Sequence, residues 1–165
     1  MGKEAGVRYL SPEREKCFPL LSHLNYRCTS DETPVYNCIA YAAGDDSIWW
    51  EPEQYDDFPT YWPDDAIKDH SLKALVSVFR TLGYRVCKSG DLEPGYEKVA
   101  LYIKDNGQYG HAARQEADGS WVSKLGDWED IRHATAQAVQ TTAEPVGGPE
   151  YGKVAKYMKR KRKAT

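Results

Sequence analysis

The sequence predicts an α+β domain, because helical and strand-like patterns occupy separate parts of the chain. A short Ala-rich helix is expected within residues 36–44, and an amphipathic helix ends at Leu82. Residues 97–125 instead alternate apolar and polar side chains in three runs separated by tight-turn dipeptides. We therefore expect the first helix to pack on an antiparallel β-meander, with the second helix completing the core.

Length and composition predict a single domain over residues 1–158. The chain has 165 residues, enough to bury a core. It has no run of eighteen apolar residues, and its first residues lack the apolar core of a signal peptide. We therefore expect no membrane association and a cytoplasmic location, where the four cysteines are reduced. Because no Cys-x-x-Cys pair is present, we expect no metal site and no cofactor.

Charge is distributed unevenly along the chain. Residues 151–165 hold seven basic side chains and no acidic one, so the net charge of −3 leaves about −10 for residues 1–150. We expect residues 159–165 to be a solvated, disordered basic tail. Since this tail has no interleaved aromatic residues and extends from an acidic body, we expect no nucleic-acid binding.

The first helix would begin at Cys38. Asn37 is a good N-cap, and Gly44 is a good stop. A thiol in the first turn of a helix meets unpaired backbone N–H groups and the positive end of the helix dipole, and both favour the thiolate. The same N–H groups could hold the oxyanion of a tetrahedral intermediate, with the Asn37 side chain as a further donor.

An aromatic and acidic loop is expected over residues 45–66. It contains Trp49, Trp50 and Trp62, and the span from Asp45 to Asp69 holds nine carboxylates. Such a dense set of aromatic residues argues against disorder. We expect the three tryptophans to shape a substrate cleft beside the Cys38 helix, with the carboxylates favouring a cationic substrate. The alternative is a structural lid whose acidic side chains are solvated.

The remaining elements follow from periodicity. Apolar residues recur at helical spacing from Asp69 or Ser71 to Leu82, before Gly83. Expected strands and weaker helical segments then follow along the chain: strands at 84–87, 97–104, 110–116 and 120–125, a weak helix or loop at 128–142, and a short helix at 151–158.

Cys38 and His111 form the pair on which a catalytic hypothesis depends. Cys38 begins a helix, and His111 lies near the start of the second meander strand in Tyr-Gly-His-Ala-Ala-Arg-Gln. An imidazole beside a thiol can hold it as thiolate and protonate a leaving amine. Gly110, directly before the histidine, would let a substrate backbone approach.

This order and placement resemble the papain-like cysteine hydrolases, with the closest layout in the NlpC-type amidases. Residues 36–155 also resemble an uncharacterised bacterial family with the runs Asn-Cys-Ile-Ala-Tyr-Ala and His-Ala-Ala-Arg-Gln. The resemblance implies a papain-like core and thiol chemistry at Cys38 and His111. The chain departs from the NlpC-type motif in having Asn37 before the cysteine, where that group has Asp, and Ile39-Ala40 after it, where that group has a small pair.

Two residues could orient the imidazole. The resemblance implies a third group about a dozen residues after His111, which corresponds to Ser123. A two-residue turn at Asp118-Gly119 would instead bring Asp127 within reach. A carboxylate orients an imidazolium better than a hydroxyl does, so both residues remain candidates.

The sequence therefore predicts a cysteine peptidase or amidase that cleaves an amide, peptide or isopeptide bond in a peptide or protein substrate. A catalytically silent domain that binds a peptide or protein partner through the Trp-rich acidic loop is the alternative. A transferase using the same thiol is a third hypothesis. The sequence makes no prediction of oligomeric state.

Overall fold

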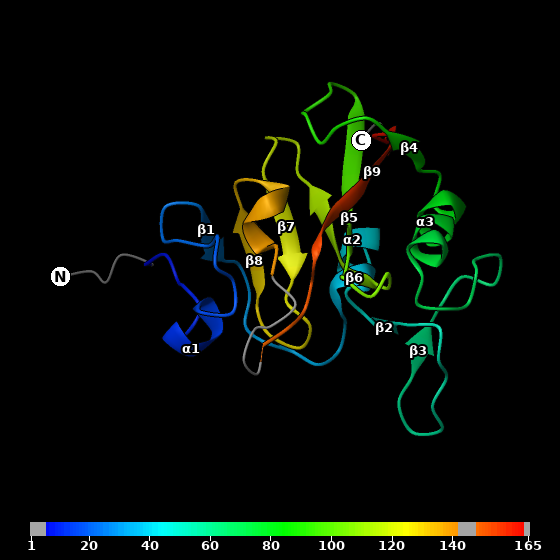
Figure 1. Ribbon diagram of the computed structural model, residues 1–165, viewed down its shortest axis with the longest axis horizontal. Helices are drawn as coiled ribbons and strands as arrows, with labels where there is room; N and C mark the ends of the chain where they lie inside the picture. Colours follow the sequence, from blue (N-terminus) through cyan, green and yellow to red (C-terminus); the bar gives the residue numbers. More distant parts are fainter. Residues whose placement is uncertain (1–5, 142–147, 164–165) are drawn as a thin grey trace.

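An antiparallel sheet crosses the protein and has helices on both faces (Figure 1). The structure is a computed structural model that describes residues 6–141 and 148–163. Within these residues, seven strands pair side by side in the order β1 (Tyr26–Cys28), β8 (Asp130–His133), β7 (Trp121–Lys124), β6 (Tyr109–Gln115), β5 (Tyr96–Ile103), β9 (Lys153–Lys161) and β4 (Arg85–Cys87). An antiparallel sheet with separate helices is the predicted α+β class.

The helices and the remaining strands are short. A separate parallel pair is formed by β2 (Trp49–Trp50) and β3 (Thr60–Tyr61). The helical elements are α1 (Pro12–Glu15), α2 (Cys38–Ala43), α3 (Leu72–Thr81) and the 3-10 turn η1 (Ala136–Val139). Among the described residues, none of these helices is long and apolar enough to cross a membrane.

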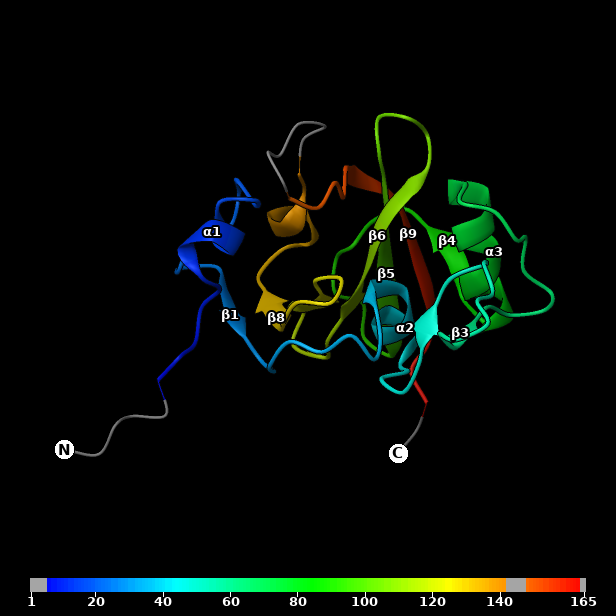
Figure 2. The ribbon, with the colours of Figure 1, turned by 90° about the horizontal axis from the view of Figure 1, so that it is seen from below.

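The sheet separates two apolar cores. One core lies under α2 and α3, where Ile39 and Leu75 pack against Val99 and Leu101. The other lies on the opposite face, where the N-terminal segment and η1 cover Ala100 and Tyr102 of β5, among others. Figures 1 and 2 show α2 and η1 on opposite sides of the sheet. The sheet is therefore buried on both faces at its centre.

The helices predicted within residues 36–44 and up to Leu82 both form, and each has a side-chain N-cap. The Asn37 side chain accepts a hydrogen bond from the Ala40 N–H at 3.2 Å, and Gly44 ends α2 with φ of 91°. Ser71 caps α3 in the same way, accepting from the Ala74 N–H at 3.0 Å. Both helices therefore begin where a side-chain acceptor satisfies an N–H group that the helix leaves unpaired.

The C-terminal region differs from the prediction. The expected helix at 151–158 and the expected disordered tail at 159–165 are replaced, as far as the structure describes them, by β9, which lies between β5 and β4. Lys159 pairs with Glu93 at 2.8 Å, and Arg160 pairs with Glu97 at 2.5 Å. Carboxylates in β5 and in the loop before it thus neutralise cations that the sequence alone presents as a solvated run.

The segment expected to be a weak helix or loop is more ordered than expected. Residues 128–142 contain β8 and η1, and β8 is paired on one side with β7 and on the other with β1. The predicted three-stranded meander, β5–β6–β7, is present but forms only the centre of a wider sheet.

Candidate active site

The α2 helix packs on β6 and β7 and begins at Cys38. Part of residue Cys38 is exposed to solvent, but burial of its thiol raises the pKa to about 11. The backbone N–H groups of Ala112, Ile39 and Cys38 itself act in the opposite direction by favouring the thiolate. Desolvation is the larger effect, so the thiol is protonated near pH 7. The thiolate expected from the helix terminus is not the resting state.

His111 lies on β6 and is fully buried. Its ring stacks on Tyr151, with the ring centroids 4.1 Å apart, and meets Tyr102 edge-on at 5.0 Å. Burial, together with the neighbouring His133, holds the pKa of His111 well below 6.5. The imidazole is therefore neutral at physiological pH.

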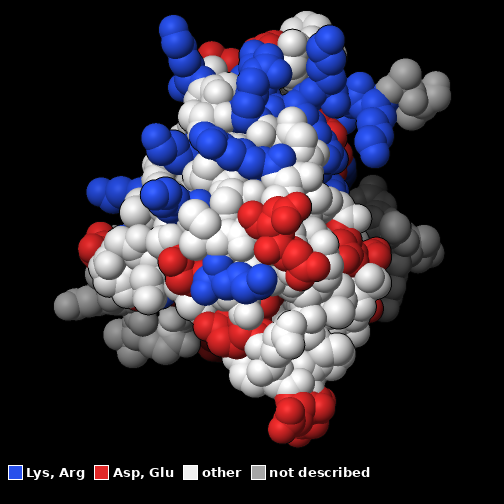
Figure 3. Space-filling model, turned by 90° about the vertical axis from the view of Figure 1, so that its right-hand side faces the viewer, with Lys and Arg blue, Asp and Glu red and all other residues white. Residues whose placement is uncertain are grey.

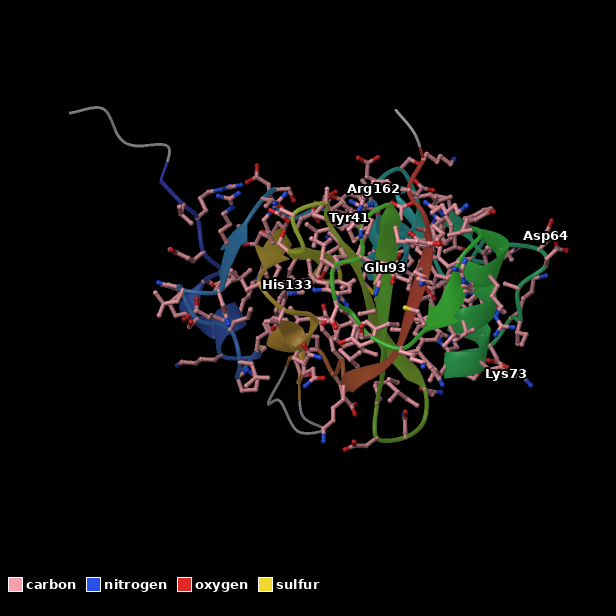
Figure 4. The ribbon with its side chains drawn as sticks, turned by 90° about the horizontal axis from the view of Figure 1, so that it is seen from above. Tyr41, Asp64, Lys73, Glu93, His133 and Arg162 are labelled. Atoms are coloured by element: carbon pink, nitrogen blue, oxygen red, sulfur yellow. The ribbon has the colours of Figure 1, made fainter. Side chains whose placement is uncertain are left out.

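A serine joins His111 to a second buried histidine. The Ser123 Oγ is 2.9 Å from the His111 Nε2 and 2.8 Å from the His133 Nε2. The His133 Nδ1 is 2.7 Å from the Thr135 carbonyl oxygen. Burial lowers the pKa of His133 to about 4, so this ring is also neutral. His133 lies in the interior of the molecule, beside β8 and η1 (Figure 4).

The carbonyl at the end of this chain fixes the direction of each hydrogen bond. The Thr135 oxygen can only accept, so the proton of neutral His133 is on Nδ1 and its Nε2 is an acceptor. The Ser123 hydroxyl then donates to the His133 Nε2 and accepts from the His111 Nε2–H. The remaining nitrogen of His111, Nδ1, therefore carries a lone pair. That buried atom has no hydrogen-bond partner among the described residues.

Cys38 and His111 lie in the same region without a direct hydrogen bond among the described residues. The thiol is close enough to β6 for the Ala112 N–H, next to His111, to influence its pKa. Burial raises the pKa of Tyr102 and of Tyr151, the two rings that contact His111, and a negative charge on Cys38 adds to both shifts. Three neighbours of the imidazole thus interact with the thiol.

Of the two candidates for an orienting group, the structure brings only Ser123 to His111. Asp127 is exposed in the turn between β7 and β8 and makes no hydrogen bond to His111. The β6–β7 pairing explains why, because Gln115 pairs with Trp121 and Arg114 with Val122. This register leaves His111 and Ser123 on the same face of the sheet, diagonally across the two strands.

Asn37 makes three structural hydrogen bonds. Its Nδ2 donates to the Trp50 carbonyl at 2.8 Å, and its Oδ1 accepts from the Trp50 N–H at 3.1 Å and from Ala40. Asn37 thus ties the start of α2 to β2. Because these bonds use one of the two Nδ2 hydrogens, the role as an oxyanion donor stays a prediction.

The tryptophans also differ from the expected cleft wall. Trp50 and Trp62 are only 5% and 7% exposed and belong to the core under α2 and α3. Trp49 is half-buried and meets Phe58 edge-on at 6.0 Å. The tryptophans of the loop therefore serve packing, as in the structural alternative, while Tyr55, Phe58 and Tyr61 are its exposed aromatic residues.

Lys124 is a buried cation on the side of the sheet where α2 lies. Its Nζ donates to the carbonyl oxygens of Thr33 at 2.9 Å and Gly126 at 2.7 Å, and to that of Trp128. Burial lowers the pKa of Lys124, and its charge lowers that of Cys38. With its three donors engaged, this lysine acts as a fixed positive charge.

Carboxylates lie near Tyr109, at the start of β6. The pKa of Tyr109 is raised by burial and then by the charges of Cys38, Glu53 and Glu51. Its ring stacks on His70, which is paired with Glu53. Tyr109 therefore lies within the electrostatic influence of both the thiol and the acidic loop.

Gly110 serves a different purpose from the one expected. A Cβ at this position would lie 2.2 Å from the Tyr151 carbonyl oxygen. The glycine thus admits the backbone of the chain itself, and places the Tyr151 ring on His111, rather than admitting a substrate backbone.

His133 is the site residue that sequence reasoning missed. The signal was the short run Asp130-Ile131-Arg132-His133 after a Gly126-Asp127 turn, in which all residues but Arg132 are buried. Reading this run as a strand opposite β7 would have placed His133 across from Trp121 and near Ser123. No group of three or more metal-ligating side chains occurs within the described part of the chain.

Comparison with known proteins identifies a family and no closer relative. No curated protein and no solved structure matches the chain. Residues 27–159, more than half of the chain, match a domain of unknown function. This span includes Cys38, His111, Ser123 and His133. The chain therefore belongs to the family described as Domain of unknown function (DUF7689).

Proposed function

We propose that this protein is a cysteine hydrolase with a papain-like core, in which Cys38 is the nucleophile and His111 the general base. The observation that carries the proposal is the His111 Nδ1. This buried nitrogen has no hydrogen-bond partner among the described residues. The hydrogen bonds through Ser123, His133 and Thr135 place the ring proton on Nε2, so Nδ1 keeps a lone pair that can accept a proton. Buried polar atoms are normally paired, so an unpaired one is a candidate for a functional role.

The reaction would start from a neutral pair. As the Cys38 sulfur attacks the carbonyl carbon of an amide, its proton passes to the His111 Nδ1 and a tetrahedral oxyanion forms. The C–N bond then breaks, and the imidazolium returns the proton to the leaving amine. Water, activated by the same nitrogen, hydrolyses the thioester and restores the thiol.

Two groups would support the negative charge of this pathway. The N–H groups of Cys38 and Ile39 favour a thiolate and lie at the start of α2. The Lys124 ammonium, fixed by three carbonyl oxygens, lowers the free energy of an anion beside Cys38. Ser123 would position the imidazole and stabilise the proton on its Nε2.

The substrate class is inferred from the acidic groups that act on Tyr109, at the start of β6. The pKa of Tyr109 is raised by burial and by the charges of Cys38, Glu53 and Glu51. A peptide or protein with a cationic side chain next to the scissile amide would complement these charges. The partly exposed Tyr109 and His70 would supply aromatic contact for the aliphatic part of that side chain.

Peptide cleavage by matched variants tests the proposal. A peptide library is incubated with the wild type, Cys38→Ala and Cys38→Ser, and new termini are identified by mass spectrometry. Cys87→Ala, which alters a half-buried cysteine on edge strand β4, is the control. We expect cleavage to disappear in both Cys38 variants, persist in Cys87→Ala and favour cationic sequences. Unchanged cleavage in Cys38→Ala would remove the proposal.

A second candidate is supported by the high pKa of the Cys38 thiol. A catalytically silent papain-like domain would keep this cysteine as a buried packing residue and bind a peptide or protein through the exposed aromatic and acidic loop. Iodoacetamide alkylation distinguishes the two. If Cys38 is alkylated in the native wild type and its alkylation rate falls in His111→Asn, the result indicates catalysis. If Cys38 resists alkylation until denaturation in both proteins, the result indicates the binding domain.

A further inference from the structure

A groove of about 370 Å³ lies along the exposed side of α3, next to β9. Apolar side chains and cations line it together. The apolar residues are Ile67, Leu72 and Val76, and the cations are Lys73, Arg80 and Lys156. We call this feature the α3 groove.

The cations of the α3 groove lack carboxylate partners among the described residues. Lys159 and Arg160, further along β9, are paired with Glu93 and Glu97. No such pair involves Lys73, Arg80 or Lys156 within residues 6–141 and 148–163. An apolar surface surrounded by unpaired charges of one sign fits a partner that brings apolar side chains and carboxylates together.

The loop between β2 and β3 has that composition. Tyr55 is 50% exposed and Phe58 is 39% exposed, and their rings lie 6.3 Å apart. Between them in the sequence are Asp56 and Asp57, both exposed and without an ion pair among the described residues. We call residues 55–58 the acidic loop tip. It presents two rings flanking two negative charges.

Both surfaces belong to the same end of the molecule. Figure 3 shows cations gathered over the upper part of this end, while an acidic tip projects at the bottom. In Figure 1 the β2–β3 loop is the lowest segment on the same side as α3. Asp64 and Lys73 both project outward there (Figure 4).

This arrangement is self-complementary under a two-fold rotation. A two-fold axis parallel to this face, passing between the loop tip and the groove, would bring the loop tip of each copy over the groove of the other, forming both contacts at once. Such an isologous contact closes with two copies and leaves no unsatisfied groove. Lys73 and Arg80 are seven helical positions apart, roughly 10 Å. Hence no single carboxylate contacts both, and a segment with adjacent acids is the better match.

We propose that the protein forms a homodimer in which the acidic loop tip of each copy occupies the α3 groove of its partner. Tyr55 and Phe58 cover the apolar floor, and Asp56 and Asp57 face Lys73 and Arg80. This interface uses none of the proposed catalytic residues, so it stands or falls independently of the hydrolase function.

Charge reversal on each side, separately and together, tests the interface. The dimer dissociation constant is measured by sedimentation velocity over a range of concentrations for the wild type, Arg80→Glu, Asp57→Lys and the double variant. Arg27→Glu, an exposed arginine on β1 at the other edge of the sheet, is the matched control. Circular dichroism verifies that each variant is folded.

We expect a wild-type dimer, a rise in the dissociation constant of about tenfold or more in each single variant, and recovery to within about threefold in the double variant. The control should match the wild type. The proposal is overturned by a wild type that remains monomeric, by a dimer that tolerates both single reversals, or by a double variant without recovery. Cys38 alkylation, measured in parallel, should be the same in all five proteins.

Discussion

His111 and Ser123 are joined by a 2.9 Å hydrogen bond near the place where backbone pairing between β6 and β7 ends. The same hydroxyl lies 2.8 Å from His133, so one serine aligns two buried imidazoles. A side-chain bridge thus continues the connection between the strands where their described backbone pairing has stopped, and it fixes which nitrogen of His111 is free.

Replacing Ser123 by alanine should affect both stability and activity. The substitution leaves the Nε2 atoms of His111 and His133 buried without a partner, which should lower the free energy of unfolding by about 1–3 kcal/mol. Peptide cleavage should fall by roughly one to two orders of magnitude, because the imidazole loses its orientation. Urea unfolding and cleavage rates are the measurements. Ser22→Ala, at an exposed turn, should change neither, and a Ser123→Ala protein with both properties intact would contradict the assigned role.

The lowered pKa of His133 predicts a loss of stability in acid. Its pKa is about 4 in the folded protein and 6.5 where the side chain is not buried. The unfolded chain therefore binds the proton more readily than the folded protein does. This residue's contribution to the free energy of unfolding is retained above pH 6.5 and lost as pH falls toward 4. The loss amounts to about 3 kcal/mol for this shift.

Urea titrations at pH 7.5, 6, 5 and 4.5 measure that loss. Ser22→Ala, at an exposed turn, is a suitable control, since a serine does not titrate in this range and the variant should keep the wild-type pH dependence. His133→Gln should be less stable than the wild type at pH 7.5 but lose less free energy of unfolding between pH 7.5 and 4.5. A His133→Gln variant with the full wild-type slope would show that the acid sensitivity arises elsewhere.

Local signals predicted α2, α3 and the centre of the sheet. Asn37, Ser71 and the Asp118-Gly119 turn act within a few residues of their position, so a sequence pattern is sufficient to place them. The strand β9 was missed because its exposed cations resemble a solvated tail. Its partners, including Glu93 and Glu97, are more than sixty residues away in the sequence.

In the candidate site, too, local patterns predicted some residues, and contacts between distant segments determine the rest. Cys38 and His111 could be selected from residue type and position, and Ser123 from spacing. The role of His133 depends on the pairing of β7 with β8, and the raised pKa of Cys38 depends on burial by the folded chain. Neither property is written in a local pattern, because each arises from contacts between segments that are distant in sequence.

Lys124 should control the ionisation of Cys38. Lys124→Met removes the fixed charge that lowers the thiol pKa, so the thiolate should become scarcer and alkylation slower at any given pH. Three carbonyl oxygens lose their donor, and the free energy of unfolding should fall by about 2–4 kcal/mol.

The pH profile of iodoacetamide alkylation, read for each cysteine by mass spectrometry, measures this change. In the wild type, the Cys38 rate should rise about tenfold per pH unit toward pH 11. In Lys124→Met the same rise should be displaced to higher pH. The alkylation rate of Cys87 at each pH should be the same in the two proteins. A displacement to lower pH would show that the lysine does not favour the thiolate.

The contact between Gly110 and the Tyr151 backbone should determine how well water is excluded from the His111 imidazole. In Gly110→Ala the new methyl group would lie 2.2 Å from the Tyr151 carbonyl oxygen, so this segment must move and the ring must leave His111. We expect a loss of about 1–3 kcal/mol in the free energy of unfolding. Because burial is the main cause of the low His111 pKa, solvent entry should raise that pKa toward 6.5.

Tyr151→Leu removes the ring without the backbone collision and should raise the His111 pKa with a smaller change at the backbone amides of β6. NMR titration of the imidazole resonances distinguishes these effects, and a His111 pKa that stays low in both variants would mean that Tyr151 is not what excludes water from the ring.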